Sequence, residues 1–201
     1  MRAAPIRTPR PDLLPLRVDH AEETAAVLSD PVPHTYTGGS PPRPAALRDR
    51  YGRLVAVSPD PAVSPDPAVS WCNRVLRLRA APGPLTGTVR ATVADRGATA
   101  EIAWVVGTPW QGRGLASEAA RGLASRLRER GVRTLVAHVH PAHRASAGVA
   151  AAAGLSPTGE VRDGEVRWEV RPTPAPPAPS PARPAGAPGP ATPPDGDPRS
   201  R

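Results

Sequence analysis

Two glycines directly before a helical pattern are the strongest candidates for chemistry in this sequence. The stretch WQGRGLASEAARGL (residues 110–123) places Gly112 and Gly114 at the expected start of a helix. The first N–H groups of a helix have no partner inside it and lie at the positive end of the helix dipole. Because glycine has no side chain, a phosphate could approach these amides closely, and Arg113 could add positive charge. The pattern therefore predicts an anion-binding loop.

Two familiar phosphate loops do not fit this stretch. A Walker-type loop requires Gly-Lys-Ser/Thr, and the chain contains no Lys. A dinucleotide fingerprint requires G-x-G-x-x-G after a parallel βαβ unit, whereas GRGLAS ends in Ser117 and follows segments that look like antiparallel strands. The loop is therefore expected to hold a phosphate in another setting.

Three histidines follow the loop, and two of them, His138 and His140, could move protons. His138 and His140 alternate on one face of the expected strand VRTLVAHV and the residues after it, and His143 lies shortly beyond. An unperturbed imidazole titrates near neutral pH, which suits acid–base chemistry. A metal site is the alternative, but no carboxylate or Cys lies at a suitable spacing.

The loop needs a strand before it and a helix after it, and the surrounding sequence predicts both. Leu115, Ala119, Leu123 and Leu127 form one stripe of an amphipathic helix, and Gly131 is a good stop. Asp19 with Glu22 has the form of a capping box for an earlier helix. Alternating or apolar runs predict strands at 13–18, 71–79, 85–94, 99–106, 132–139 and 165–170, and helical patterns cover 19–30, 45–57, 115–130 and 144–154.

Composition limits the class of protein. The 201 residues suffice for one domain with extensions, and 39% hydrophobic content without any Phe leaves Leu, Val, Ala and Trp to fill the core. The net charge of +8 comes entirely from Arg, which indicates a coding bias, although a basic protein attracts phosphorylated ligands. Aromatic content of 3% argues against nucleic-acid binding. Cys72 is alone, and no signal or membrane segment is evident, so we expect a soluble, cytoplasmic protein.

The 30 prolines indicate where the domain ends. We expect a flexible N-terminal arm at 1–11, a folded domain at 12–171 and a disordered Pro-rich tail at 172–201, which could also bind a partner. The duplicated AVSPDP in residues 56–70 cannot form regular structure and predicts an inserted, exposed loop.

Several of these segments together resemble the GNAT acyl-CoA N-acetyltransferases. QGRGLA (111–116) fits the family pattern Q/R-x-x-G-x-G/A, AEIAWVV looks like its fourth strand, and VAHVHPAHRASAGVAAAAGL (136–155) resembles its fifth strand and following helix. PTGEVRDGEVRWEV is similar to the closing strands of the ribosomal-protein-alanine acetyltransferase-like branch. The resemblance implies an α/β (α+β) fold with a mixed, mostly antiparallel central sheet flanked by helices.

The resemblance also implies acetyl-CoA as acyl donor and cosubstrate, with no metal. In such folds the fourth and fifth strands separate, and the pantetheine arm lies between them. Strand backbone at Trp104, Val105 and Val106 would contact the pantetheine, and the loop amides would bind the pyrophosphate. The cofactor residues implied are Trp104, Val105, Val106, Gln111, Gly112, Arg113, Gly114, Leu115, Ala116, Ser117, His143 and Ser146.

For catalysis the resemblance implies transfer of an acetyl group to a primary amine of a small molecule or protein N-terminus by direct attack. Glu101 is the first candidate for the base that deprotonates the amine through a water, and His140 is its rival. Ala150 stands where the family commonly has a general-acid Tyr, and His143 replaces the usual Asn. The alternative is therefore a catalytically silent acyl-CoA-binding module. We expect a monomer or homodimer, an unidentified amine acceptor, and substrate recognition around His34, Tyr36 and Gly38.

Overall fold

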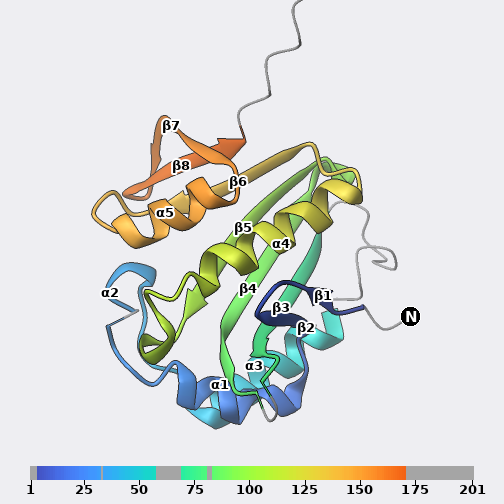
Figure 1. Cartoon of the computed structure of the whole chain (residues 1–201), viewed down its shortest axis with the longest axis vertical. Helices are drawn as coiled ribbons and strands as arrows, with labels where there is room; N and C mark the ends of the chain where they lie inside the picture. Colours follow the sequence, from blue (N-terminus) through green and yellow to red (C-terminus); the bar gives the residue numbers. More distant parts are fainter. Residues whose placement is uncertain (1–3, 33, 58–68, 81–82, 171–201) are drawn as a thin grey trace, which may run out of the picture. The chain divides into compact units, whose positions relative to one another are not determined.

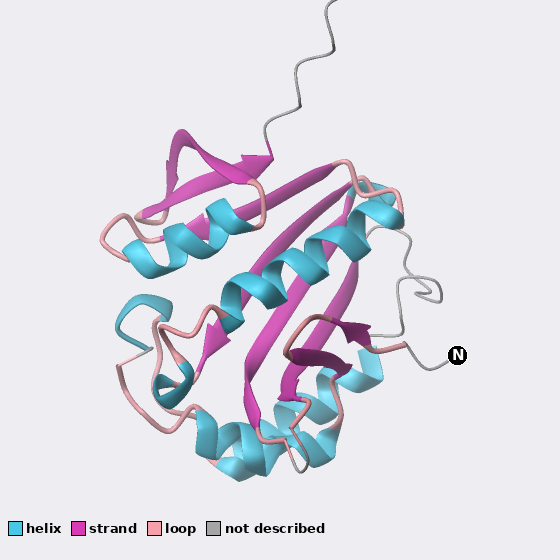
Figure 2. Ribbon diagram, viewed as in Figure 1, coloured by secondary structure: helices cyan, strands magenta, loops and turns pink. Residues whose placement is uncertain are grey.

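A single eight-stranded sheet with helices packed against it forms the described part of the chain (Figure 1; Figure 2). The computed structural model describes residues 4–32, 34–57, 69–80 and 83–170. The strands are β1 (Ile6–Arg7), β2 (Pro11–Pro15), β3 (Ser70–Leu78), β4 (Leu85–Ala94), β5 (Thr99–Val106), β6 (Thr134–Val139), β7 (Leu155–Arg162) and β8 (Glu165–Val170). The helices are α1 (Ala21–Val27), α2 (His34–Thr37), α3 (Pro44–Val57), α4 (Leu115–Glu129) and α5 (Arg144–Ala152), with short 3-10 turns at Val18–His20, Asp95–Gly97 and Thr108–Trp110.

The strand order is β1-β2-β3-β4-β5-β6-β8-β7, and every pairing except one is antiparallel. The exception is the parallel pair of β5 and β6, which are joined by the crossover through α4. The expected mixed, mostly antiparallel sheet flanked by helices is therefore confirmed. No described helix is long and apolar enough to cross a membrane.

The main core lies between the sheet and the pair α4 and α5. Leu115, Ala119, Leu123 and Leu127, the stripe read from the sequence, are all buried, and three of them join the core formed by the inward side chains of the strands. Inward and outward residues alternate along β4 and β5, as a sheet with one covered face requires. A second, smaller cluster joins α1 to α3 through Ala21, Ala25, Leu47 and Tyr51.

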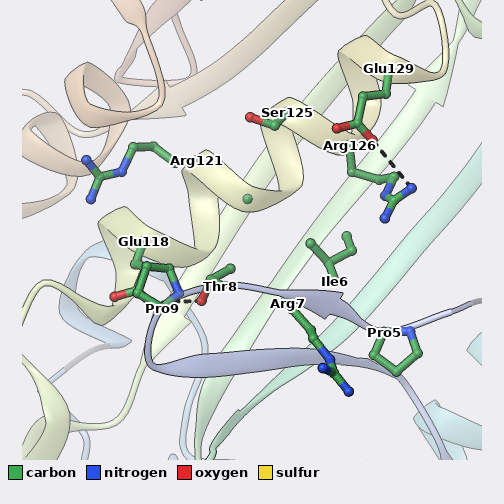
Figure 3. A pocket seen from close by; sticks show the side chains of 11 residues that line it. Pro5, Ile6, Arg7, Thr8, Pro9, Glu118, Arg121, Ser125, Arg126 and Glu129 are labelled. Atoms are coloured by element: carbon green, nitrogen blue, oxygen red, sulfur yellow. Dashed lines mark hydrogen bonds and ion pairs between the residues drawn. The ribbon is translucent and has the colours of Figure 1, made fainter.

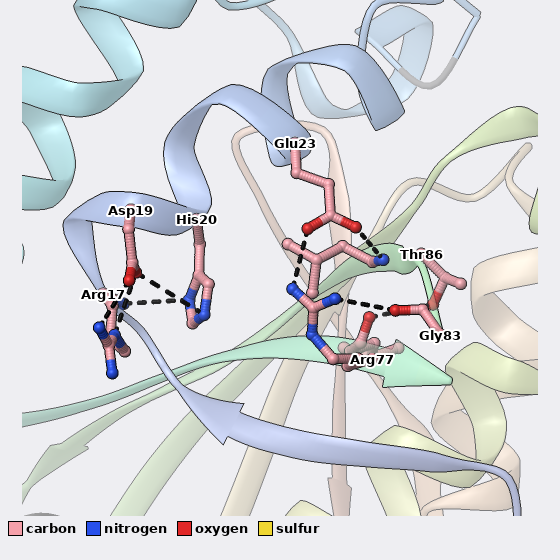
Figure 4. A network of polar contacts seen from close by, with 9 residues as sticks. Arg17, Asp19, His20, Glu23, Arg77, Gly83 and Thr86 are labelled. Atoms are coloured by element: carbon pink, nitrogen blue, oxygen red, sulfur yellow. Dashed lines mark hydrogen bonds and ion pairs between the residues drawn. The ribbon is translucent and has the colours of Figure 1, made fainter. Parts of the chain in front are cut away.

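A network of hydrogen bonds connects helix α1 to the sheet (Figure 4). Glu23 accepts hydrogen bonds from Nη2 of Arg77 on β3 (2.8 Å) and from the backbone N–H of Leu85 on β4 (2.7 Å). Arg77 also donates from Nη1 to the Gly83 carbonyl (2.8 Å). Nearby, His20 is buried, and its Nδ1 accepts from the Arg17 N–H (3.2 Å). The expected capping box at Asp19 is wrong, because Asp19 pairs with Arg17 and α1 begins only at Ala21.

The N-terminal segment differs from the flexible arm expected at 1–11. Ile6–Arg7 forms β1, which pairs with β2, and Ile6 is buried in the main core. The strand expected at 13–18 corresponds to β2, which begins earlier, at Pro11, and ends at Pro15. Buried Arg74 holds the segment further, since its Nη1 donates to the Ala4 carbonyl (2.7 Å). These contacts were not visible in the sequence, because the arginines and prolines of 1–11 gave no periodic pattern.

Two other expectations have separate outcomes. The region around His34, Tyr36 and Gly38, expected to recognise the substrate, contains the one-turn helix α2. Most of the 56–70 repeat and the whole of the 172–201 tail lie outside the described residues. The domain boundaries drawn from composition therefore stay predictions.

Candidate functional site

The site begins where strands β5 and β6 separate. Their parallel pairing covers only Thr99 with Thr134, Ala100 with Leu135 and Glu101 with Val136. Beyond Glu101, β5 continues to pair with β4 on its other side as far as Val106. The edge of β5 that faces β6 is therefore free of strand partners from about Ala103 onward, whereas β6 stays paired with β8 on its other edge as far as Val139.

The glycine loop follows β5 and leads into α4. Gly112 and Gly114 have φ values of 71° and 74°, a left-handed conformation that favours glycine. Gly114 is the N-cap of α4, and its carbonyl accepts the hydrogen bond of the Glu118 N–H (3.0 Å). Gln111 ties the loop back to the strand, because its Nε2 donates to the Val106 carbonyl (2.9 Å). Several loop amides are thus left at the positive end of α4.

A cavity of about 380 Å³, here called the loop cavity, lies between β5, the glycine loop and α5. It is lined by all the candidate cofactor residues except Arg113: Trp104, Val105, Val106, Gln111, Gly112, Gly114, Leu115, Ala116, Ser117, His143 and Ser146. The guanidinium of Arg113 instead lies over the ring of Trp110, 5.2 Å from its centroid. The two loop glycines therefore line the cavity, and Arg113 between them does not.

A smaller pocket of about 200 Å³, here called the histidine pocket, lies beside the loop cavity. Both candidate catalytic residues, Glu101 and His140, line it, together with His138. Four residues line both spaces: Tyr36, Trp104, His143 and Ser146. The two spaces are therefore neighbours, and a ligand in one can present a group to the other.

Strand alternation explains why the acidic and basic side chains meet. Ala100 and Ile102 point into the core under α4 and α5, so Glu101 points to the other face of the sheet. His138 lies on this same face, two residues beyond Val136, the partner of Glu101. As a result His138 Nδ1 is 3.4 Å from Glu101 Oε1. The sequence placed both residues on neighbouring strands but could not give the register that joins them.

The other two histidines contact Tyr36 from α2. The Tyr36 ring stacks on that of His143, with centroids 4.2 Å apart and planes 7° apart, and lies 5.5 Å from that of His140. His140 Nδ1 accepts the Ala142 N–H (3.2 Å), so the neutral ring carries its hydrogen on Nε2. Burial, with a contribution from His140, lowers the pKa of His143 below its usual value of 6.5. His143 is therefore a neutral ring at pH 7.

The open side of the histidine pocket continues into a surface groove of about 640 Å³. Glu101 and His138 line both spaces, and the groove adds side chains from β4, β7 and β8. Within it Arg167 pairs with Glu160 (3.4 Å). The described residues contain no group of three or more His, Cys, Asp or Glu that could hold a metal ion.

Some residues around the site were missed from the sequence. Trp110 and Val32 line the loop cavity, and Arg90 and Glu165 line the histidine pocket. Arg90 lies between Val89 and Ala91 on β4, so the alternating pattern placed it on the exposed face of the strand but did not show which residues lie beside it. Tyr36 was expected only in substrate recognition, and the contact between α2 and α5 carries no local sequence signal.

Comparison with known families agrees with this architecture. The family model described as an acetyltransferase (GNAT) domain matches residues 10–156. No curated protein sequence gives a significant match.

Solved structures of the same fold are similar over most of the chain. A GNAT-family acetyltransferase from Bacillus anthracis has a TM-score of 0.67 at 18% identity, with 83% of this chain and 98% of that chain covered. The ribosomal L7/L12 alpha-N-protein acetyltransferase RimL, solved in complex with coenzyme A, has a TM-score of 0.66 at 12% identity, with coverage of 83% and 97%. The GNAT domain of S. lividans PAT has a TM-score of 0.60 at 26% identity, with coverage of 79% and 89%.

Proposed function

The chain belongs to the GNAT acetyltransferase family, and we propose that it transfers the acetyl group of acetyl-CoA to a primary amine by direct attack. The separation of β5 from β6 beside the loop cavity is the observation that carries the proposal. It leaves strand backbone without a strand partner and the N-terminal amides of α4 around one cavity. A pantetheine amide needs the first kind of group, and a diphosphate needs the second.

In this proposal the diphosphate of CoA lies on the amides of Gly112 and of residues 114–117. The pantetheine then runs along the free edge of β5 from Val106 toward Trp104, and the thioester reaches the border with the histidine pocket. A β5 N–H on this edge would donate to the thioester carbonyl and stabilise the oxyanion that forms during attack.

The amine must lose a proton before or during attack, and Glu101 is the proposed base. It is half exposed, and His138 at 3.4 Å keeps its carboxylate turned toward the pocket. A water between Glu101 and the amine would carry the proton. His140 suits this role less, because its Nδ1 is occupied by the Ala142 N–H. We assign His140 instead as a hydrogen-bond donor through Nε2.

The leaving thiolate needs a proton or must depart without one. Ala150, at the position where the family commonly has a Tyr, is fully buried in the core and offers none. Tyr36 lines both spaces and is the nearest phenol at their border, so we propose it as the proton donor. Should Tyr36 have no such role, the thiolate can still take its proton from water.

The acceptor class has two candidates. RimL is named for acetylating a protein N-terminus, and the groove beside the histidine pocket is open enough for a chain end. A small-molecule amine would need only the histidine pocket, with its volume of about 200 Å³. In both cases Glu101 would accept the proton of the attacking amine.

Release of free thiol from acetyl-CoA, measured over a panel of small amines and peptides with free N-termini, tests the proposal. We expect amine-dependent release by the wild type and a large loss in Glu101→Gln. Protein that binds acetyl-CoA but releases no thiol with any amine would favour the silent acyl-CoA-binding module, which the buried Ala150 also suits.

A further inference from the structure

The N-terminal hairpin contacts the first turn of α4 through one carboxylate (Figure 3). Glu118 is buried on α4 and faces β1 and the turn to β2. Its Oε1 accepts the backbone N–H of Arg10 (2.5 Å) and the Thr8 hydroxyl (2.8 Å), and its Oε2 accepts Nε of Arg10 (2.8 Å). Gly122 lies one turn later on α4, where its missing side chain leaves room for the Thr8 methyl group. A Cβ at Gly122 would lie only 2.7 Å from that methyl carbon.

These hydrogen bonds make Glu118 a fixed anchor. Burial by itself would raise the pKa of Glu118, but the bonds from Arg10 and Thr8 outweigh it and hold the pKa below its usual 4.5. The carboxylate is therefore charged at neutral pH. With the bond from the Arg10 Nε, it fixes the direction of the guanidinium.

The other end of the Arg10 guanidinium reaches the glycine loop. Nη1 donates to the Arg113 carbonyl (2.7 Å), and Nη2 lies 3.3 Å from where a Cβ on Gly114 would stand. A trans peptide is planar, and its C=O and N–H point in opposite directions. Holding the Arg113 carbonyl toward Arg10 therefore turns the Gly114 N–H away from Arg10. Gly114 lines the loop cavity, and Arg10 is not among the lining residues.

We infer that Arg10, anchored by Glu118 and Thr8, is a positioning residue that locks the Arg113–Gly114 peptide with its N–H toward the diphosphate of CoA. The inference rests on the proposed function and adds to it a part of the chain outside the glycine motif. The glycines on both sides of Arg113 have a left-handed conformation, and the hydrogen bond from Arg10 holds the Arg113 carbonyl between them. The positive charge of Arg10 also offsets the negative charge of the Glu118 carboxylate, which would otherwise repel the bound diphosphate.

The test compares Arg10→Ala and Arg10→Gln with the wild type, by calorimetry with CoA and by kinetics with two acyl donors. S-acetylpantetheine has the same thioester as acetyl-CoA but no diphosphate. We expect the Kd for CoA to rise about tenfold to a hundredfold, the loss of one hydrogen bond to a charged group. The kcat/KM for acetyl-CoA should fall by the same factor, and that for S-acetylpantetheine should stay within twofold.

Arg7→Ala is the matched control, since Arg7 lies on the same hairpin and is exposed, and Figure 3 shows its side chain pointing away from Glu118. It should leave the Kd for CoA unchanged. Glu118→Gln keeps the side-chain shape and should weaken CoA binding in the same direction as Arg10→Ala.

Three results would overturn the inference. One is a Kd for CoA in Arg10→Ala and Arg10→Gln equal to that of Arg7→Ala. Another is an equal loss with acetyl-CoA and S-acetylpantetheine, which would mean that Arg10 only supports folding. Wild-type protein without affinity for CoA would remove the proposed function as well, whereas the first two results leave that function intact.

Discussion

Replacing Gly112 by Ala tests whether the glycine loop binds through its backbone. Gly112 has a φ of 71°, and a Cβ added there meets nothing within 4 Å. The substitution is therefore strained by backbone conformation and not by crowding. A left-handed residue other than glycine costs about 1–2 kcal/mol. The loop can avoid this cost only by turning its peptides, which would remove amides from the loop cavity.

The magnitude for binding follows from the amides that are lost. Each hydrogen bond to a charged group contributes roughly 1.5–3 kcal/mol, so losing one weakens CoA binding about tenfold to a hundredfold. Calorimetry with CoA measures this change directly. Stability should fall by about 1–2 kcal/mol or less, which corresponds to a Tm lower by about 2–4 °C for each kcal/mol in a domain of this size.

Gly131→Ala is the matched control for this prediction. Gly131 has a φ of 90°, a Cβ there also meets nothing within 4 Å, and it follows the far end of α4. Its Tm should fall as in Gly112→Ala, and its affinity for CoA should not change. Equal CoA affinity of both variants and the wild type would refute the reasoning that the loop backbone holds the diphosphate.

Three further predictions concern the site and the polar network. Glu101→Gln should lower kcat by about 10²–10⁴ and leave the Kd for CoA unchanged in calorimetry; an unchanged kcat would exclude Glu101 as the base. Tyr36→Phe keeps the ring stacked on His143 and should lower kcat about tenfold or more, and Tyr36→Ala should in addition raise the KM for acetyl-CoA. Full activity of Tyr36→Phe would exclude Tyr36 as the proton donor and would mean that water protonates the leaving thiolate. Burial lowers the pKa of His20 below its usual 6.5, so protonation opposes folding, and wild-type Tm should fall as the pH drops below about 6.5. His20→Gln should show a smaller fall in Tm over the same range, and parallel Tm profiles of the two proteins would contradict this.

Much of the fold could be predicted because its elements carry regular patterns. The bounds expected for the strands at 85–94, 99–106 and 165–170 match β4, β5 and β8, and the stripe from Leu115 to Leu127 marks α4. Each of these segments buries one face, so burial repeats along the sequence. Strand β1 has only two residues and no period, and its place depends on contacts with α4 and Arg74, which are far away in the chain.

For the candidate site, too, some residues could be found from the sequence and some contacts could not. The glycine loop could be found from sequence, because the positive φ of Gly112 and Gly114 needs a residue type that the sequence shows directly. The contact of Glu101 with His138 depends on the register of two strands, and the stacking of Tyr36 on His143 depends on packing between distant elements. Neither leaves a local signal. The same holds for Arg10, whose side chain reaches the loop from the other end of the domain sequence.

The most direct measurement is calorimetric titration of the wild-type chain with acetyl-CoA and, separately, with S-acetylpantetheine. If helix and loop amides hold the diphosphate, acetyl-CoA should bind at least about a hundredfold more tightly, the effect of two or more hydrogen bonds to a charged group. Equal affinity for the two donors, or no binding of acetyl-CoA, would contradict the assignment of the glycine loop.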